Sequence, residues 1–128
     1  MKAAEILGAS GVQIGTGFLF TEECPIHKNY KDILLKSNAS KITTIGHKRG
    51  LPIRLLKNNM TREYKKLEKE DSNLEELEKF TVGRLKKAVA EGDIKEGSLM
   101  AGYTAGQFDE IVPVKDFIER LMDEYNSY

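Results

Sequence analysis

The chain has 128 residues, of which 40% are hydrophobic and 31% are charged, and its formal net charge is zero. These values suit one soluble globular domain at most, and the zero net charge excludes an overall field that favours nucleic acid or anionic lipid. The single cysteine, Cys24, excludes an internal disulfide framework and a Cys-rich zinc site. No apolar run approaches the roughly 18 residues of a membrane span, and the N-terminus lacks the apolar region of a signal peptide. We therefore expect a cytoplasmic protein that binds neither nucleic acid nor membrane.

The first forty residues are predicted to contain two helices and one strand. Residues 2–8 place apolar side chains on one helical face, and residues 12–15 (VQIG) are predicted to be a short buried strand. Residues 21–37 are predicted to return to helix, with Thr21 as the N-cap. Because a single strand cannot form a sheet, the chain is either a helical domain with one extended piece or part of a larger structure.

The stretch from residue 41 to residue 67 begins with a β-prone segment and continues with a helical pattern. Residues 41–45 (KITTI) are rich in β-branched side chains and predict a short extended segment. Between residues 53 and 67 the apolar side chains recur at steps of three or four residues. That spacing predicts an amphipathic helix over residues 53–67.

Two further helices are predicted towards the C-terminus. Ser72 and Glu75 match an S-x-x-E capping box, which predicts the start of a helix that continues to residue 89. Pro113 suits the first turn of a terminal helix over residues 113–125, whose apolar side chains line one face. Helix is therefore expected to dominate the chain.

A glycine-rich turn, Gly15-Thr16-Gly17, directly follows the predicted strand. Glycines let backbone N–H groups approach an anion closely, and a threonine hydroxyl adds another donor. In parallel α/β architectures ligands lie at the carboxyl ends of the strands. The turn is therefore a candidate phosphate cradle, although an ordinary tight turn between strand and helix accounts for the same three residues.

A second glycine-rich segment covers residues 97–106 (GSLMAGYTAG). Its small residues permit the close approach of a ligand or of another backbone. We take Met100, Ala101, Gly102 and Tyr103 as candidate pocket-lining residues. A loop or a tightly packed short helix is the alternative interpretation.

The remaining chemistry-bearing residues do not form a recognisable catalytic or metal-binding pattern. His27 and His47 lie far apart and lack a third ligand at metal spacing, so each is expected to be a surface or packing histidine. Cys24 lacks the sequence signature of a nucleophile and is expected to be a buried or half-buried thiol. We therefore expect no metal site.

The charged residues are unevenly distributed along the chain. Residues 41–66 contain eight Lys or Arg residues and one Glu, whereas residues 91–124 contain nine Asp or Glu residues and three Lys or Arg residues. A basic region can meet an acidic partner or nucleic acid, but aromatic residues do not interleave with these cations. A solvated helix face is the simpler interpretation.

Five separated stretches, in this order, resemble one enzyme family. The chain is similar to the C-terminal part of the FMN-dependent enoyl-acyl-carrier-protein reductase II and nitronate monooxygenase (2-nitropropane dioxygenase-like) family, and the resemblance covers essentially all 128 residues. The stretches are LGASGVQIGTGFLFTEEC, HKNYKDILLKS, TTIGHKRGLPIRLLKN, EGDIKEGSLMAG and DEIVPVKDFIERLM.

The resemblance implies an α/β fold that is mostly helical as it stands. Family members are FMN-binding TIM (β/α)8 barrels, and a complete barrel takes about 250 residues. The chain is therefore expected to be a C-terminal fragment of such a barrel with a C-terminal helical region. Residues 1–40 would hold the last strand, at 12–15, with its flanking helices, and residues 41–128 the mostly helical region. Strands one to seven would lie upstream.

The resemblance also implies a cofactor and a divided site. Gly15 and Thr16 match half of the FMN phosphate site, whose other half, a Gly-Gly turn after strand seven, has no counterpart here. The family's catalytic residues would also lie upstream, so none is assigned. At the second glycine-rich segment the family commonly reads MAGQ-x-AG, and Tyr103 stands where Gln is usual.

The implied activity is flavin-dependent oxidoreduction. The substrate would be an enoyl thioester of fatty acid biosynthesis, which is reduced with NAD(P)H as electron donor, or it would be a nitronate. The amino-acid sequence of residues 43–64 resembles the reductase branch more closely. We expect the isolated chain to be inactive and to associate with an upstream half of the barrel or with itself. The alternative is a non-enzymatic helical protein-interaction module.

Overall fold

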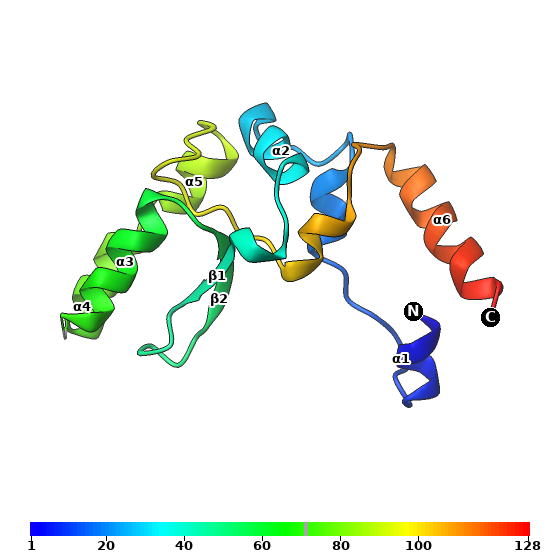
Figure 1. Cartoon of the computed structure of the whole chain (residues 1–128), viewed down its shortest axis with the longest axis horizontal. Helices are drawn as coiled ribbons and strands as arrows, with labels where there is room; N and C mark the ends of the chain where they lie inside the picture. Colours follow the sequence, from blue (N-terminus) through cyan, green and yellow to red (C-terminus); the bar gives the residue numbers. More distant parts are fainter. Residues whose placement is uncertain (71) are drawn as a thin grey trace.

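A computed structural model of the chain describes residues 1–70 and 72–128, and its elements form an open arch (Figure 1). Helices α3 and α4 lie at one end of the arch, helices α1 and α6 lie at the other, and a β-hairpin and α2 lie between them. The elements in chain order are α1 (Lys2–Ile6), η1 (Thr16–Phe20), α2 (Lys28–Leu35), η2 (Ala39–Lys41), β1 (Ile42–Ile45), β2 (Ile53–Leu56), α3 (Asn59–Lys69), α4 (Leu74–Thr81), α5 (Arg84–Val89), η3 (Tyr103–Gln107) and α6 (Val114–Asn126), where η marks a 3₁₀ helix.

The two strands form an antiparallel hairpin in which Ile42 pairs with Leu56 and Ile45 pairs with Ile53. The connection begins at Gly46, whose φ of +84° suits glycine. A Cβ atom at Gly46 would lie 2.4 Å from the carbonyl oxygen of Leu51, so the close return of the chain also excludes a side chain there.

The hairpin separates two apolar clusters, because successive side chains of a strand point to opposite faces. Ile42 and Leu56 belong to a cluster that packs with Tyr30, Leu34 and Ala105, among others. The other face carries a second cluster, formed by Ile45, Leu55, Met60, Tyr64 and Leu77. The hairpin therefore joins α3 and α4 on one side to α2 and η3 on the other.

The predicted strand at residues 12–15 is wrong for this structure. Residues 11–14 are irregular, and Val12 is 47% exposed. A strand exists only when a neighbour pairs with its N–H and C=O groups, and no described residue pairs with this segment. Figure 1 shows it as a bare connection between α1 and η1.

The predicted helix over residues 53–67 is wrong in its first part. Residues 53–56 form β2, and the helix begins only at Asn59. Asn58 caps α3, with its side chain accepting from the N–H of Thr61 while the Thr61 hydroxyl accepts from the N–H of Asn58. The pairing of β2 with β1 overrides the helical spacing of its apolar residues.

The predicted helix over residues 21–37 begins later, at Lys28. Thr21 is not its N-cap, because Thr21 is buried and forms a parallel bridge with Val112. The side chain of His27 is the cap, since its Nδ1 accepts from the N–H of Asn29 at 3.1 Å.

The helix predicted from Ser72 to residue 89 is two helices. Asn73 and Glu76 form the capping box of α4, one residue beyond the predicted pair. Gly83, with φ of +77°, separates α4 from α5. The predicted terminal helix, the extended segment at 41–45 and the first helix are confirmed as α6, β1 and α1, with small shifts of their ends.

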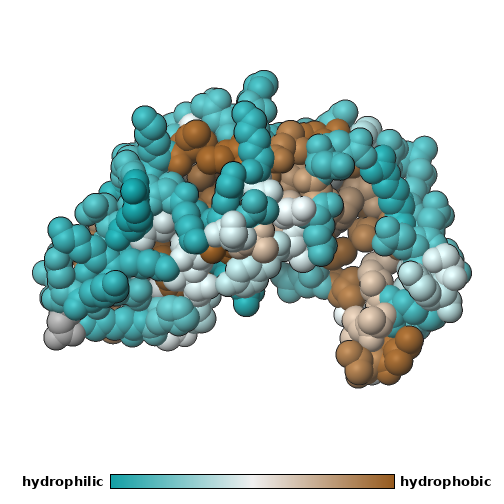
Figure 2. Space-filling model, viewed as in Figure 1, coloured by the Kyte–Doolittle hydropathy of each residue, from teal (hydrophilic) through white to brown (hydrophobic). Residues whose placement is uncertain are grey.

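The first and last helices project from the arch with little burial. Helix α1 has no buried residue, and Ile6 and Leu7 are 76% and 87% exposed. Helix α6 buries Phe117 but leaves Ile118 and Met122 exposed. Figure 2 shows hydrophobic surface where α1 lies and hydrophilic surface over α3 and α4. None of the helices in the described residues has the length and apolarity that crossing a membrane requires.

An aromatic cluster fixes the start of α6 to η1. The ring centroids of Phe18 and Phe117 are 5.1 Å apart, and those of Phe20 and Phe108 are 4.7 Å apart. Gly17 lies beneath this cluster, because a Cβ atom built there would be 2.6 Å from Cζ of Phe117.

Replacing Gly17 with Ala should therefore destabilise the chain, since the added methyl must displace Phe117. Overpacking of this kind costs about 1–3 kcal/mol, measurable by urea denaturation. Gly11→Ala is the matched control, because a Cβ atom at Gly11 meets no atom within 4 Å. Equal midpoints for the two variants would contradict this packing.

Candidate functional site

The two glycine-rich segments meet in the structure. The hydroxyl of Thr16 accepts a hydrogen bond from the backbone N–H of Gly102 at 2.9 Å, although 86 residues separate them. A Cβ atom at Gly102 would lie 3.2 Å from the Thr16 hydroxyl, so a glycine favours this approach. The Gly15–Thr16 turn and residues 100–102 therefore form one continuous surface.

The second glycine-rich segment is held in place by backbone hydrogen bonds to β2. The N–H of Leu56 donates to the carbonyl oxygen of Leu99 at 2.9 Å, and the N–H of Ala101 donates to that of Arg54 at 3.2 Å. Leu55 and Met100 accordingly form an antiparallel bridge. This isolated bridge fixes the backbone of residues 99–101 against β2.

A buried tyrosine from α2 supports the same segment. The Tyr30 hydroxyl donates to the carbonyl oxygen of Met100 at 2.7 Å, and Tyr30 is only 2% exposed. Burial raises the pKa of Tyr30 far above its ordinary value, which keeps the hydroxyl protonated as a donor. The backbone of β2 and the Tyr30 hydroxyl therefore both hold residues 99–101 in place.

A pocket of about 600 Å³ opens beside this junction. It is lined by Gly15, Thr16, Leu19, Thr44, Pro52, Ile53, Arg54, Met100, Ala101 and Gly102. Five of the candidate residues from the sequence therefore line one pocket, which we call the junction pocket. Tyr103 is not among the lining residues.

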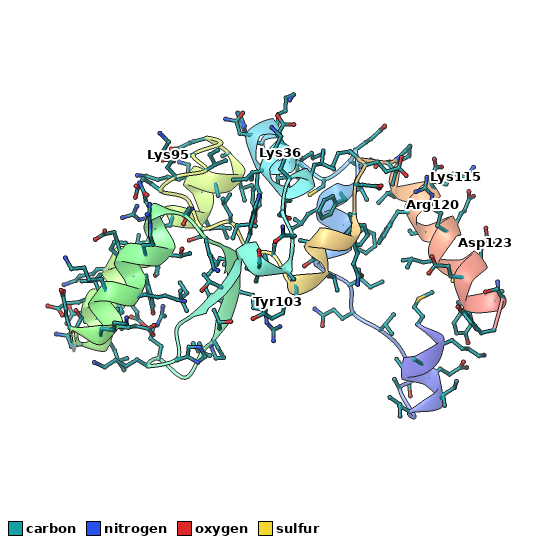
Figure 3. All side chains as sticks on the ribbon, viewed as in Figure 1. Lys36, Lys95, Tyr103, Lys115, Arg120 and Asp123 are labelled. Atoms are coloured by element: carbon teal, nitrogen blue, oxygen red, sulfur yellow. The ribbon has the colours of Figure 1, made fainter. Side chains whose placement is uncertain are left out.

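Tyr103 lies beside the junction pocket and is half-exposed. The guanidinium of Arg54 lies over its ring, 5.2 Å from the centroid, in a cation–π contact. Figure 3 shows Tyr103 on the concave side of the arch. Arg54 could not be recognised as a lining residue from the sequence, because its position depends on the pairing of the hairpin.

The start of η1 has the features of an anion cradle. Gly15 has φ of −106°, a conformation that any residue can adopt, and a Cβ atom there would meet no atom within 4 Å. The backbone conformation at this position therefore does not require glycine. A ligand that approaches the turn closely would require glycine, because a side chain would occupy the same space. Within the described residues, no acceptor takes a hydrogen bond from the N–H groups of Gly15 and Thr16.

A second pocket, of about 570 Å³, lies on the other side of the same turn. Gly15, Thr16 and Gly17 contribute to it together with residues of η3 and α6. Arg120 of α6 lines it and forms an ion pair with Glu110 at 2.5 Å. The turn therefore separates two hollows, and its backbone is accessible from both.

The other candidate side chains are not gathered at either pocket. His27 caps α2 and covers Gly92, Cys24 is half-buried, and His47 is exposed. Within residues 1–70 and 72–128, no group of three or more His, Cys, Asp and Glu side chains could hold a metal ion.

Comparison with known proteins identifies the family. Residues 1–124 match the nitronate monooxygenase family. The chain is 30% identical over 126 residues to a probable nitronate monooxygenase of Bacillus subtilis, covering 97% of this chain and 36% of that protein. It superposes on the structure of FabK from Thermotoga maritima with a TM-score of 0.89 and 38% identity, covering 99% of this chain and 40% of FabK. A mutant structure of the same FabK gives a TM-score of 0.81.

The chain therefore belongs to the nitronate monooxygenase family. It spans less than half the length of the relatives described above. Its mixed, helix-rich fold is that of the matched part of FabK. The resemblance drawn from the five sequence stretches is confirmed at the level of the family.

Replacing Tyr30 with Phe should lower the free energy of unfolding by about 1–3 kcal/mol, because the carbonyl of Met100 loses its buried donor. Tyr103→Phe makes the same chemical change at a half-exposed ring and should alter stability by less than about 0.5 kcal/mol. Urea denaturation of both variants measures the difference. Equal effects would show that the Tyr30 hydroxyl does not support this segment.

Proposed function

We propose that this chain is the C-terminal portion of an FMN-dependent oxidoreductase of the enoyl-acyl-carrier-protein reductase II or nitronate monooxygenase type. Family membership over residues 1–124 supports the flavin-dependent class. The likeness to FabK, at a TM-score of 0.89, favours the reductase branch. The single observation that carries the proposal is the junction of the Gly15–Thr16 turn with residues 100–102 beside one pocket.

FMN suits the residues at this junction. The N–H groups of Gly15 and Thr16 would hold its phosphate, because no acceptor among the described residues takes a hydrogen bond from them and the space beside Gly15 is open. When bound, FMN supplies hydride transfer between NAD(P)H and an enoyl thioester, or the oxidation of a nitronate. The chain's own residues bind and orient the cofactor, and we assign no catalytic residue to this chain.

The rest of the barrel would come from an upstream portion that this chain does not contain. The chain covers 40% of FabK, residues 11–14 lack a pairing strand among the described residues, and α1 and α6 leave apolar side chains exposed. In a complete TIM barrel, residues 12–15 would be the last strand, paired on both edges. Residues 1–40 would then belong to the barrel and residues 41–128 to the region that follows it.

The proposal implies that the chain alone is inactive. A cradle that supplies only half of the phosphate site, without the upstream residues, would not retain FMN firmly. A helical protein-interaction module would also be inactive, so activity of the isolated chain does not separate the two interpretations. Flavin binding by a completed barrel does distinguish the flavin enzyme from the interaction module. The cytoplasmic location stays a prediction.

A chimera tests the proposal directly. The part of Thermotoga maritima FabK that precedes the matched region, fused to this chain, should purify with bound flavin and reduce an enoyl thioester in the presence of NAD(P)H. The chain alone should show neither property. A folded chimera without flavin would contradict the proposed function.

Within this chimera, Gly15→Val should cause a large loss of bound flavin, because a branched side chain would occupy the space that a phosphate needs. Gly15→Ala should cause a smaller loss, since its side chain fills less of that space. Absorbance of bound flavin gives the loss, and circular dichroism should show unchanged helix content. Full flavin retention by Gly15→Val would show that Gly15 is an ordinary turn residue and does not contribute to flavin binding.

A further inference from the structure

Three cationic side chains surround a pocket on the α3 side of the hairpin. The pocket has a volume of about 350 Å³ and is lined by Thr43, Lys57, Asn58, Thr61, Arg62 and Lys65. We call it the cationic pocket. Lys57 follows β2, and the other two cations lie on the first turns of α3.

Carboxylates do not neutralise these cations within the described residues. Lys57 Nζ donates to the carbonyl oxygen of Ser40 at 2.7 Å, Lys65 donates to the Thr43 hydroxyl, and Arg62 donates to the side-chain oxygen of Asn59. Elsewhere on the surface, cations such as Lys28, Lys79 and Arg84 form ion pairs with carboxylates. The three cations are therefore positioned by neutral acceptors, and no carboxylate of the described residues forms an ion pair with them.

The strand register adds a like-charge pair at the same end of the hairpin. Ile42 pairs with Leu56, and the N–H of Lys57 donates to the carbonyl oxygen of Lys41 at 2.8 Å, so the two lysines are backbone neighbours across the ribbon. Their ammonium groups donate to the carbonyl oxygens of Lys36 and Ser40. Like charges directly opposite in an antiparallel pair are destabilising. An anion bound in the cationic pocket would offset this local concentration of positive charge.

Most neutral side chains of the cationic pocket already form hydrogen bonds within the protein. The Asn58 amide donates to the carbonyl oxygens of Ile94 and Gly97, and its oxygen accepts from the N–H of Thr61. The Thr61 hydroxyl donates back to the carbonyl oxygen of Asn58. The Thr43 hydroxyl accepts from Lys65 and keeps its own proton available for a ligand. Donors therefore predominate among the groups that a ligand would meet.

The cationic pocket is separate from the junction pocket. Thr43 lines the former and Thr44 lines the latter. Since adjacent residues of a strand point to opposite faces, the two pockets lie on opposite faces of β1. A ligand in the cationic pocket would not occupy the FMN site, so this inference goes beyond the proposed function.

We propose that the cationic pocket binds the phosphate groups of a small phosphorylated ligand. Phosphate supplies several acceptor oxygens and up to two negative charges, which match three cations and one hydroxyl donor. A neutral ligand would leave the cations unneutralised, and a cation would be repelled. Lys57 and Arg62 carry the recognition, and Lys65 binds together with the hydroxyl of Thr43.

Isothermal titration calorimetry of the 128-residue chain with inorganic pyrophosphate at low ionic strength tests the site. Pyrophosphate should bind saturably, and Arg62→Ala should weaken binding roughly tenfold or more, because a charge-assisted hydrogen bond is lost. Lys79→Ala is the matched control, since it removes one positive charge from an exposed ion pair on α4. It should change the affinity less than about twofold.

Stability provides a second readout that a purely structural role would not give. Lys57→Ala should leave the melting temperature of the ligand-free chain unchanged or raised, because it removes a like-charge neighbour of Lys41. Pyrophosphate should raise the melting temperature of the wild-type chain and not that of Arg62→Ala. Absence of saturable binding, equal weakening by Arg62→Ala and Lys79→Ala, or a clear loss of stability in ligand-free Lys57→Ala would overturn the proposal.

Discussion

The backbone pairing of residues 99–101 with β2 is the constraint on which the rest of the structure depends. It lays a chain segment from the second half of the sequence along a hairpin from the middle. Once Met100 is in this register, its carbonyl oxygen meets the Tyr30 hydroxyl, and the N–H of Gly102, two residues further on, meets the hydroxyl of Thr16. One short ladder therefore positions α2, η1 and the hairpin relative to one another. It also brings the two glycine-rich segments to one pocket.

The hairpin gives this arrangement two independent faces. One face packs against α2 and η3 and carries the junction pocket, and the other packs against α3 and carries the cationic pocket. Because β1 alternates its side chains, the neighbouring residues Thr43 and Thr44 contribute to different sites. A ribbon of two short strands can thus contribute to the proposed FMN site on one face and to the proposed phosphate site on the other, with a different threonine at each.

Local patterns predicted the elements whose stability is local. Helix α6 has a long apolar stripe, and β1 is rich in β-branched residues, so both were recognisable from the sequence. The short run IRLL at residues 53–56 fits helical spacing equally well, and only its pairing with β1 decides that it is a strand. The contact between Thr16 and Gly102 spans 86 residues and leaves no local signal. The family resemblance assigned Gly15 and Thr16 to the FMN phosphate, whereas the physical junction of the two glycine-rich segments required the fold.

Amide hydrogen exchange of Gly102 measures whether the Thr16 hydroxyl holds the two glycine-rich segments together. If the Thr16 hydroxyl joins the two glycine-rich segments, the Gly102 amide should exchange slowly in the wild-type chain. It should exchange much faster in Thr16→Val, which keeps the shape of the side chain and removes the acceptor, while the amide of Leu56 stays protected through its bond to Leu99. A Gly102 amide that exchanges at the unprotected rate in the wild type, or equally slowly in both chains, would contradict this account.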